Sequence, residues 1–416
     1  MSRLVQRGAR GGAVVFLIFA ATYFLSALLR AVTATLAPQF SAEFQLGAAD
    51  LGLLAGAYFL GFSLLQLPLG SALDRWGPRR VEVGLLAVAV LGCMLFASAT
   101  GFVQLVLARV LIGMGVAACL MAPLTYFRRH LPPTVQLRLN SWMLMTGSLG
   151  MVASTVPVQL LLPTWGWRGL FWALAVLLAL GAWSIHAGLP DDGATPPPGE
   201  HAAPASYAPI LRHPEFVRVA PLGLVLYGGM IAIQALWAGP WLTQVRGLTP
   251  GEASQGLLLI NSGMLVAFLG WGWVMPTLAR RGVQVRMLVG WGVSINLVLL
   301  SVILWLGASA GAVHWMAWCV SASVVSLAQP ALAQVFPVHM AGRALSAFNL
   351  VVFVGVFVLQ WGMGAGIDLL RASGVNVVDA FRLTGLGFLV LVAASHAWYV
   401  AAPGARVHNA AAKVST

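Results

Sequence analysis

Two arginines, Arg30 and Arg109, lie inside long runs of apolar residues, where few side chains could do chemistry. A cation at the centre of a bilayer costs at least about 2.5 kcal/mol, so such residues usually face protein or water and have a function. The 11 Asp and Glu residues all lie in loops or near the ends of apolar runs. A guanidinium without a nearby acid favours a carboxylate or phosphate, which it binds through two parallel hydrogen bonds. The sequence therefore predicts an anion site at these arginines, although a structural role for Arg109 stays open.

Polar residues on the same apolar runs are candidates to complete this site. Tyr23 and Ser26 precede Arg30 by seven and four residues, so the three side chains share one helix face. Hydrogen bonding between helices is the alternative for each polar candidate, and core packing is the alternative for the aromatic stripe Tyr227, Trp237 and Trp241. The predicted substrate-binding residues are Arg30, Arg109, Tyr23, Tyr58, Gln234, Asn261, Asn349 and Gln360.

The composition of the whole chain indicates that these residues lie in a membrane. Of its 416 residues, 60% are hydrophobic and 8% are charged, and the mean hydropathy is +0.88. Soluble domains carry about 25% charged residues, whereas about 20 apolar residues in a helix suffice to cross a bilayer. The predicted fold is an all-α integral membrane protein with twelve transmembrane helices. We expect them near residues 13–37, 50–73, 81–99, 102–125, 139–163, 169–188, 219–243, 252–276, 285–307, 312–335, 344–368 and 380–401.

Positive charge is unevenly distributed between the loops. The chain has 23 Lys and Arg residues, and its net charge is +12. If the N-terminus is cytoplasmic, the opposite side of the membrane holds only Arg168, Arg246, Arg371 and Arg382, and almost all other cations face the cytoplasm. This bias follows the positive-inside rule, so we expect a cell inner (plasma) membrane protein with both termini in the cytoplasm. The same bias explains the charge without a nucleic-acid partner.

A polar stretch rich in proline separates the chain into two halves. It contains the sequence DDGATPPPGEHAAPAS, which cannot build a packed core. We predict an N-terminal six-helix bundle at 1–188, a cytoplasmic linker at 189–217, a C-terminal six-helix bundle at 218–403 and a cytoplasmic tail at 404–416. Two six-helix halves around a central site are a known plan of transporters. We expect a monomer in the lipid bilayer.

The segment after the second predicted span resembles a family signature. Residues 70–80 read GSALDRWGPRR, which is similar to the motif G-x-x-x-D-R-x-G-x-R-R of the major facilitator superfamily. Residues 109–115, RVLIGMG, resemble the R-x-x-x-G-x-G pattern of the same family. The resemblance implies the fold of that superfamily and secondary transport by alternating access. The gating residues it implies are Gly70, Asp74, Arg75, Gly77, Arg79 and Arg80.

The physical chemistry of this motif predicts a latch between the halves. Asp74 ends the second span, where its carboxylate could meet the positive N-terminal end of the eleventh span. Such a contact would hold the cytoplasmic side closed and release it during transport. For Arg79 and Arg80 the alternative is that they only set the orientation in the membrane.

The predicted function is secondary active transport of a small solute, an organic anion, by proton symport or exchange. The chain lacks a nucleotide-binding loop of the G-x-x-x-x-G-K-S/T type, so a gradient would supply the energy. His314 and Asp74 are candidates for proton coupling, with a structural hydrogen bond as the alternative for His314. The sequence predicts no cofactor, no metal site and no catalytic residue, so an enzyme is not expected. The alternatives are a drug–proton antiporter and a non-transporting membrane sensor.

Overall fold

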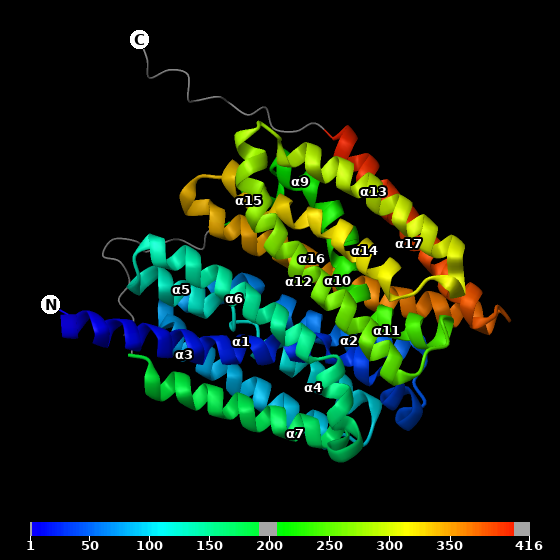
Figure 1. Ribbon diagram of the computed structural model, residues 1–416, viewed down its shortest axis with the longest axis horizontal. Helices are drawn as coiled ribbons and strands as arrows, with labels where there is room; N and C mark the ends of the chain where they lie inside the picture. Colours follow the sequence, from blue (N-terminus) through cyan, green and yellow to red (C-terminus); the bar gives the residue numbers. More distant parts are fainter. Residues whose placement is uncertain (1, 191–205, 403–416) are drawn as a thin grey trace, which may run out of the picture.

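The computed structural model describes residues 2–190 and 206–402, which are almost entirely helical (Figure 1). Within these residues, nine helices are long and apolar enough to cross a membrane. Two shorter apolar helices, α2 (Ala48–Leu64) and α4 (Phe102–Gly115), are each extended by a following helix. The predicted all-α membrane fold is therefore confirmed.

Kinks at two glycines divide two long helices into two passes each. Helix α3 (Gln66–Ala97) contains Gly77 at φ +79°, and helix α7 (Val156–Gly188) contains Gly166 at φ +62°. These values lie in the left-handed region, which glycine adopts at no steric cost because it has no Cβ. The chain reverses at these residues, so each long helix belongs to two membrane passes.

With these reversals, the described residues make twelve passes. The first six are α1 (Ser2–Phe44), α2 with 66–76, 78–97, α4 with α5 (Met121–His130), α6 (Pro133–Ala153) with 156–165, and 167–188. The last six are Pro214–Val245, α12 (Pro250–Arg280), α13 (Val285–Leu306), α14 (Ala312–Ala322) with α15 (Ala328–Val335), α16 (Val338–Ala372) and α17 (Val377–Ala401). Much of the predicted linker, residues 191–205, lies outside the described residues, and the short helix α8 (Ala208–Leu211) follows it.

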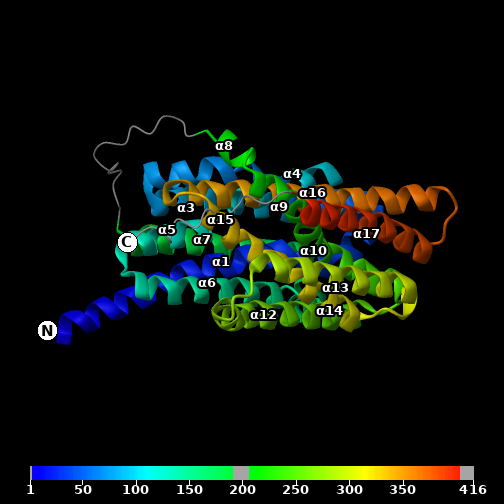
Figure 2. The same cartoon turned by 90° about the horizontal axis from the view of Figure 1, so that it is seen from above.

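Two ends of the bundle are distinguished below. The terminal face is the end at which α1 begins and α17 ends, and it includes the Gly77 kink. The distal face is the opposite end, where α1 ends and α2 begins. Figure 1 shows the N-terminal and the C-terminal passes as two groups of helices that diverge towards the terminal face. In the view of Figure 2 the helices of the two groups overlap, and α1 and α6 lie beside α12.

The two halves meet along α2 and α16, whose backbones touch. A Cβ added to Gly52 would collide with the Gln360 carbonyl, and one added to Gly364 would collide with the Ala48 carbonyl. A Cβ on Gly56 would lie 3.0 Å from the ring of Phe357. We call Gly52, Gly56 and Gly364 the glycine seam, because any larger residue there would force the helices apart.

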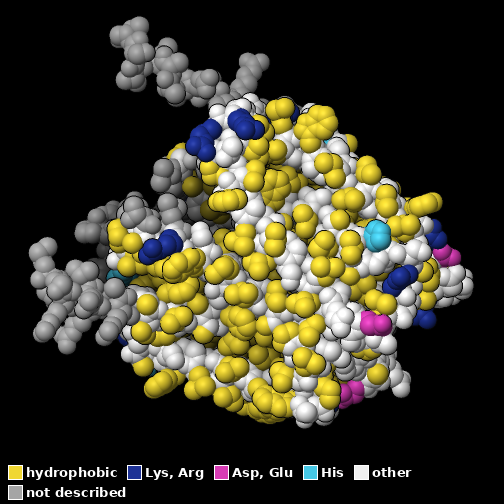
Figure 3. All heavy atoms as spheres, in the orientation of Figure 1, with side chains coloured by type: hydrophobic (Ala, Val, Ile, Leu, Met, Phe, Trp, Pro, Cys, Tyr) yellow, Lys and Arg dark blue, Asp and Glu magenta, His cyan; other side chains and the backbone are white. Residues whose placement is uncertain are grey.

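Hydrophobic side chains cover the middle of the molecular surface. Figure 3 shows them across one broad face, with charged side chains nearer its edges. Trp273, Trp305 and Leu160 are 88%, 78% and 73% exposed. Since large apolar side chains are rarely so exposed to water, this surface fits the hydrocarbon layer of a bilayer.

Candidate functional site

Arg30 lies partly exposed on α1, beside tyrosines from both halves. Its guanidinium interacts electrostatically with the phenols of Tyr23 and Tyr58 and with that of Tyr227 in η1 (Gly223–Tyr227). The Nε atom is buried and has no hydrogen-bond partner among the described residues. None of the ion pairs formed among the described residues includes Arg30. This cation therefore lies near the boundary of the halves without an acidic partner.

Aromatic rings continue this site across the boundary. The Arg30 guanidinium carbon lies 5.9 Å from the centroid of the Phe62 ring. Phe62 in turn packs edge-on against Phe353 of α16, with 4.7 Å between the ring centroids. On the other side, a Cβ added to Gly147 would lie 2.5 Å from the ring of Tyr23. Helix α6 thus holds the Tyr23 ring closely, and the arginine has both phenol and phenyl neighbours.

Arg109 lies behind Tyr58 and is 1% exposed. Its Nη1 atom donates a 2.9 Å hydrogen bond to the carbonyl of Leu29, and its guanidinium carbon lies 5.1 Å from the centroid of the Tyr58 ring. The two arginines therefore flank Tyr58. Arg109 braces the α1 backbone one residue before Arg30, although its Nε and Nη2 atoms have no partner among the described residues.

The other predicted polar residues are hydrogen-bonded within the C-terminal half. Gln234 donates to Asn261 at 2.8 Å, joining the seventh pass to α12. Asn349 accepts a 2.6 Å bond from the amide of Gln329 in α15. Gln360 is fully buried and donates to the Ala232 carbonyl at 3.5 Å. These bonds join helices of one half, which is the alternative that the sequence left open for them.

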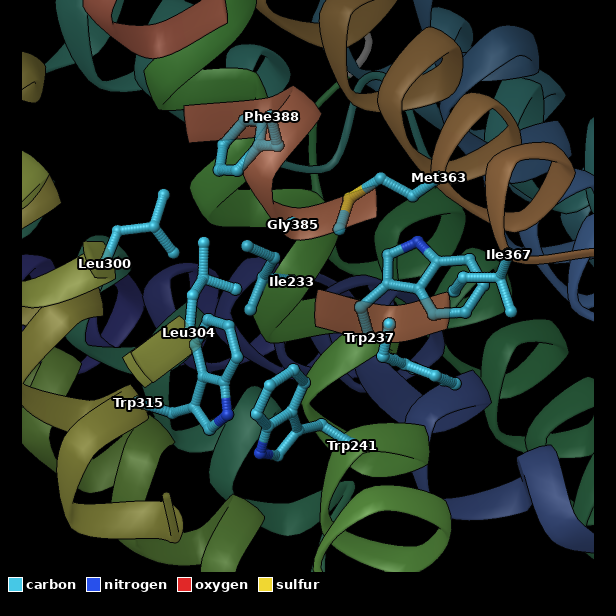
Figure 4. Close-up of a pocket in the computed structure, with 11 residues that line it drawn as sticks. Ile233, Trp237, Trp241, Leu300, Leu304, Trp315, Met363, Ile367, Gly385 and Phe388 are labelled. Atoms are coloured by element: carbon cyan, nitrogen blue, oxygen red, sulfur yellow. The ribbon is translucent and has the colours of Figure 1, made fainter. Parts of the chain in front are cut away.

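An apolar pocket lies inside the C-terminal half, among the residues shown in Figure 4. Hydrophobic side chains and Gly385 line it, including Trp237, Trp241 and Trp315. The Trp237 indole donates to the Gln360 carbonyl at 3.2 Å, and the Trp241 indole donates to the Ala310 carbonyl at 3.0 Å. Their rings are fixed by these bonds, so this part of the aromatic stripe serves packing.

Arg218 is a further arginine inside a membrane pass, in addition to Arg30 and Arg109, which the apolar runs of the sequence had indicated. It is 2% exposed because the seventh pass begins at Pro214 rather than near residue 219. Its Nη1 lies 3.3 Å from a Glu215 carboxylate oxygen, and its Nε donates to the Tyr399 carbonyl at 3.0 Å. Unlike Arg30, this arginine has an acid beside it.

Glu82 is a buried acid that the sequence placed only at the end of a span. The structure encloses it completely, since its exposed fraction is 0%. Its Oε1 atom lies 2.9 Å from the Thr22 hydroxyl on α1. The helical pass begins at Pro78, directly after Gly77, so Glu82 lies a full turn inside it. The Gly-Pro pair in the sequence was the available signal for this earlier helix start.

The predicted gating residues lie on the terminal face. The Asp74 side chain is 71% exposed and forms a 3.6 Å ion pair with Arg129 of α5, within its own half. Arg79 lies 3.5 Å from a ring nitrogen of His186, and the Arg75 guanidinium lies 5.6 Å from the centroid of the Trp76 ring. Arg80 is exposed, and a Cβ on Gly70 would meet nothing within 4 Å. A contact from Asp74 to the eleventh span stays a prediction for another conformation.

At the distal face, an acid makes the kind of contact predicted for Asp74. Asp368 of α16 accepts hydrogen bonds from the backbone N–H groups of Ala48 at 3.0 Å and Ala49 at 2.7 Å. These groups begin α2 and have no partner within that helix, and the positive end of the helix dipole also favours a carboxylate. We call this contact the distal clasp, and it joins the two halves.

His314 lies in the first turn of α14. Its Nδ1 atom accepts a 3.2 Å hydrogen bond from the backbone N–H of Gly311, so the ring caps its own helix. This bond is the structural alternative that the sequence left open for His314.

Comparison with known proteins identifies relatives among transporters. A family model described as Major Facilitator Superfamily matches residues 19–359. A chloramphenicol resistance protein of Streptomyces lividans is 28% identical over 238 residues, which cover 55% of this chain and 58% of that protein. The 4-hydroxybenzoate transporter PcaK of Pseudomonas putida is 32% identical over 170 residues, or 40% of this chain and 38% of the transporter. The chain thus matches less than two thirds of the length of either curated relative.

The fold is also that of solved structures. A bacterial homologue of the human lysosomal transporter Spinster, in an inward-facing and occupied conformation, superimposes with a TM-score of 0.73. That comparison covers 94% of this chain and 96% of the homologue at 19% sequence identity.

Proposed function

The chain belongs to the Major Facilitator Superfamily, and on that premise we propose that it carries a small organic anion across a membrane by alternating access. The observation that supports the anion is Arg30, a partly exposed cation near the boundary of the halves that forms no ion pair within the described chain. A carboxylate there would accept two parallel hydrogen bonds from the guanidinium.

The surroundings of Arg30 favour an aromatic carboxylate. Tyr23, Tyr58 and Tyr227 supply phenol hydroxyls that can donate to carboxylate oxygens. The rings of Phe62 and Phe353 supply apolar surface on which an aromatic ring can pack edge-on or offset. The similarity to a 4-hydroxybenzoate transporter supports the same class of solute.

Arg109 has a different proposed role from Arg30. Its hydrogen bond to Leu29 fixes the backbone beside Arg30, and its 1% exposure leaves little surface for a solute in this conformation. We therefore assign Arg109 to positioning Arg30, and direct contact with the solute would require a different conformation.

The distal clasp and the uneven distribution of arginines between the two faces together suggest which side of the carrier is closed. Positive loops favour the cytoplasmic side, so the terminal face, with Arg79, Arg80 and Arg129, would lie in the cytoplasm of a cell whose inner membrane holds the protein. The clasp would then close the outer side. On the inner side, Asp74 would pair with Arg129 of its own half rather than with the start of α16. Proton symport or exchange would drive the cycle.

Efflux of a neutral drug is the second candidate function, because a chloramphenicol resistance protein is among the relatives. Chloramphenicol carries no carboxylate, so its transport would not need the charge of Arg30. The two candidates therefore differ in their dependence on one residue.

The test is uptake by purified protein in proteoliposomes. We would compare radiolabelled 4-hydroxybenzoate, benzoate and chloramphenicol, using wild type, Arg30→Ala, Arg109→Ala and the control Arg371→Ala, which alters an exposed arginine. Loss of one partner of a buried charge pair costs about 2–5 kcal/mol, so Arg30→Ala should weaken carboxylate affinity at least about thirtyfold. Carboxylate transport that is unchanged in Arg30→Ala, or transport of chloramphenicol alone, would contradict the anion proposal.

A further inference from the structure

Among the acids of the described residues, Glu82 alone is fully buried. It lies where the third pass meets α1, and its Oε2 atom has no hydrogen-bond partner within the described chain. Burying an ionised carboxylate without a cation is very costly, and such a group usually takes up a proton instead. The gating motif and the anion site leave this acid without a role.

The hydrogen bonds of Thr22 indicate where a proton lies. The Thr22 hydroxyl oxygen is 3.0 Å from the Phe19 carbonyl and 2.9 Å from Glu82 Oε1. A hydroxyl has one proton to donate, and a carbonyl oxygen only accepts. If Thr22 donates to Phe19, the contact with Glu82 needs a proton from the carboxyl group. A protonated Glu82 satisfies both contacts, whereas an ionised Glu82 leaves one of them without a hydrogen.

Within the described residues, no ion pair includes Glu82, and Thr22 is the side chain that hydrogen-bonds to it. Cys119, in the turn between α4 and α5, interacts electrostatically with Glu82 and is 1% exposed. Several charged or titratable groups of the helices packed around α3 have other partners. Arg129 of α5 pairs with Asp74, His186 of α7 contacts Arg79, Arg109 of α4 donates to Leu29, and Tyr126 and His130 of α5 stack on each other.

A polar path connects Glu82 to the anion site. Cys119 interacts electrostatically with both Glu82 and Arg30, and Thr22, Ser26 and Arg30 follow one face of α1 at spacings of four. Eight residues of helix span about 12 Å, so Glu82 and Arg30 act on each other at moderate range. Unit charges at about 12 Å with an effective dielectric constant of about 20 change an affinity about tenfold.

We propose that Glu82 is the site of a co-transported proton, coupled to the solute through Arg30. This inference rests on the proposed anion transport. An ionised Glu82 and a bound carboxylate compete for the charge of Arg30, and protonation of Glu82 removes the competition. The proton therefore binds Glu82 together with the anion, and both leave on the other side of the membrane. One proton with one monocarboxylate carries no net charge.

The test begins with the proton itself. Infrared spectra of the wild-type protein in liposomes should contain a protonated-carboxyl band at neutral pH that disappears as the pH rises. The band should be absent in Glu82→Gln and present in Glu43→Gln, whose carboxylate is partly exposed beside Arg168. Thr22→Val, which removes the partner hydroxyl, should shift the frequency of the band and keep it. A spectrum that Glu82→Gln leaves unchanged would overturn the inference.

Coupling to Arg30 is measured in the same samples. Arg30→Gln removes the cation that favours the ionised acid, so the band should persist to a pH about one unit higher, which corresponds to the tenfold interaction. Addition of 4-hydroxybenzoate to wild type should likewise make the band persist to a higher pH. A midpoint that Arg30→Gln leaves unchanged would overturn the coupling.

The outcomes for the two proposals are distinguishable. If the band is missing from wild type, or if Glu82→Gln leaves it unchanged, while carboxylate uptake still depends on Arg30, Glu82 is rejected as the proton site and the anion proposal stands. A band that shifts in Arg30→Gln, together with carboxylate uptake that Arg30→Ala leaves unchanged, would retain the buried proton and reject the anion site.

Discussion

The pass formed by α2 and residues 66–76 and the pass formed by α16 each have an acid near the C-terminal end, and the two acids, at opposite ends of the bundle, have different surroundings. At the distal face, Asp368 accepts two backbone hydrogen bonds from the first residues of α2. At the terminal face, Asp74 lies near the end of the segment 66–76 that continues α2, is 71% exposed and pairs with Arg129 of its own half. A carboxylate thus joins the two halves at the distal face, whereas at the terminal face a carboxylate pairs only within its own half.

This difference suggests a reciprocal arrangement. Each acid lies at the C-terminal end of one pass, close to the level at which the other pass begins. If the halves rock about the site at Arg30, breaking the distal clasp would bring Asp74 towards the start of α16. The two carboxylates would then stabilise opposite conformations, and their balance would set the populations of the two states.

The largest effect is expected at the glycine seam. In Gly364→Ala the new Cβ would collide with the backbone of Ala48, and overpacking costs about 1–3 kcal/mol, so the ratio of distal-open to distal-closed protein should rise about 5- to 150-fold. Spin labels at Ala42→Cys and Ser373→Cys would report the separation, since the native cysteines are buried. The matched control is Gly362→Ala, where a Cβ meets nothing within 4 Å. Equal distances in the two variants would show that the seam does not limit closure.

The next effect is expected at the distal clasp. Asp368→Asn weakens a helix cap, and caps contribute about 0.5–2 kcal/mol, so the distal-open fraction should rise about 2- to 30-fold in the same spin-label measurement. Asp50→Asn is the matched control, because Asp50 accepts a bond from Gly47 at the same helix end but within its own half. If both variants opened the distal face equally, the contact between the halves would not be the cause.

A smaller effect, of opposite sign, is expected at Asp74. A charge near a helix end contributes about 0.3–1 kcal/mol, so Asp74→Asn should raise the ratio of distal-closed to distal-open protein about two- to fivefold. Exchange of solute should slow, and binding should be spared. The double variant with Asp368→Asn should return the balance towards wild type. Weaker binding with normal turnover would contradict the reciprocal arrangement.

The smallest effect is expected at Glu43, which also lies at the distal face. Glu43 pairs with Arg168 at 2.6 Å within one half, and exposed ion pairs contribute about 0–1 kcal/mol. Glu43→Gln should lower the thermal midpoint slightly and leave the spin-label distances unchanged. A shift in those distances would mean that charge at this face matters irrespective of the clasp.

The architecture could be predicted from the sequence because membrane passes have a local signal. Long apolar runs set the number of passes, and the motif at residues 70–80 indicated the family. Boundaries were less certain where a turn is short, as at Gly77 and Pro78, or where a pass begins with a charged turn, as at Glu215 and Arg218. Hydropathy reports the average of a window, and it does not reveal which single residue starts a helix.

The site was predicted in part for the same reason. Their spacing predicted that Tyr23 and Arg30 share one helix face, Tyr58 was a separate candidate, and the structure places both phenols beside the Arg30 guanidinium. The burial of Glu82 and the clasp of Asp368 depend on contacts between residues that are 60 and 320 positions apart in sequence. Nothing in the local sequence specifies such contacts. The partner of Asp74 also depends on the conformation, which a single sequence does not encode.

The glycine seam has a consequence for the speed of the conformational cycle. Interlocked side chains must change rotamer before two helices can separate, and each such step adds to the activation barrier. Where glycine lies against backbone, few side chains need to change rotamer, so the helices can slide or separate without that barrier. The interface between α2 and α16 therefore combines close contact with a low activation barrier, which would allow a stable closed state to open rapidly.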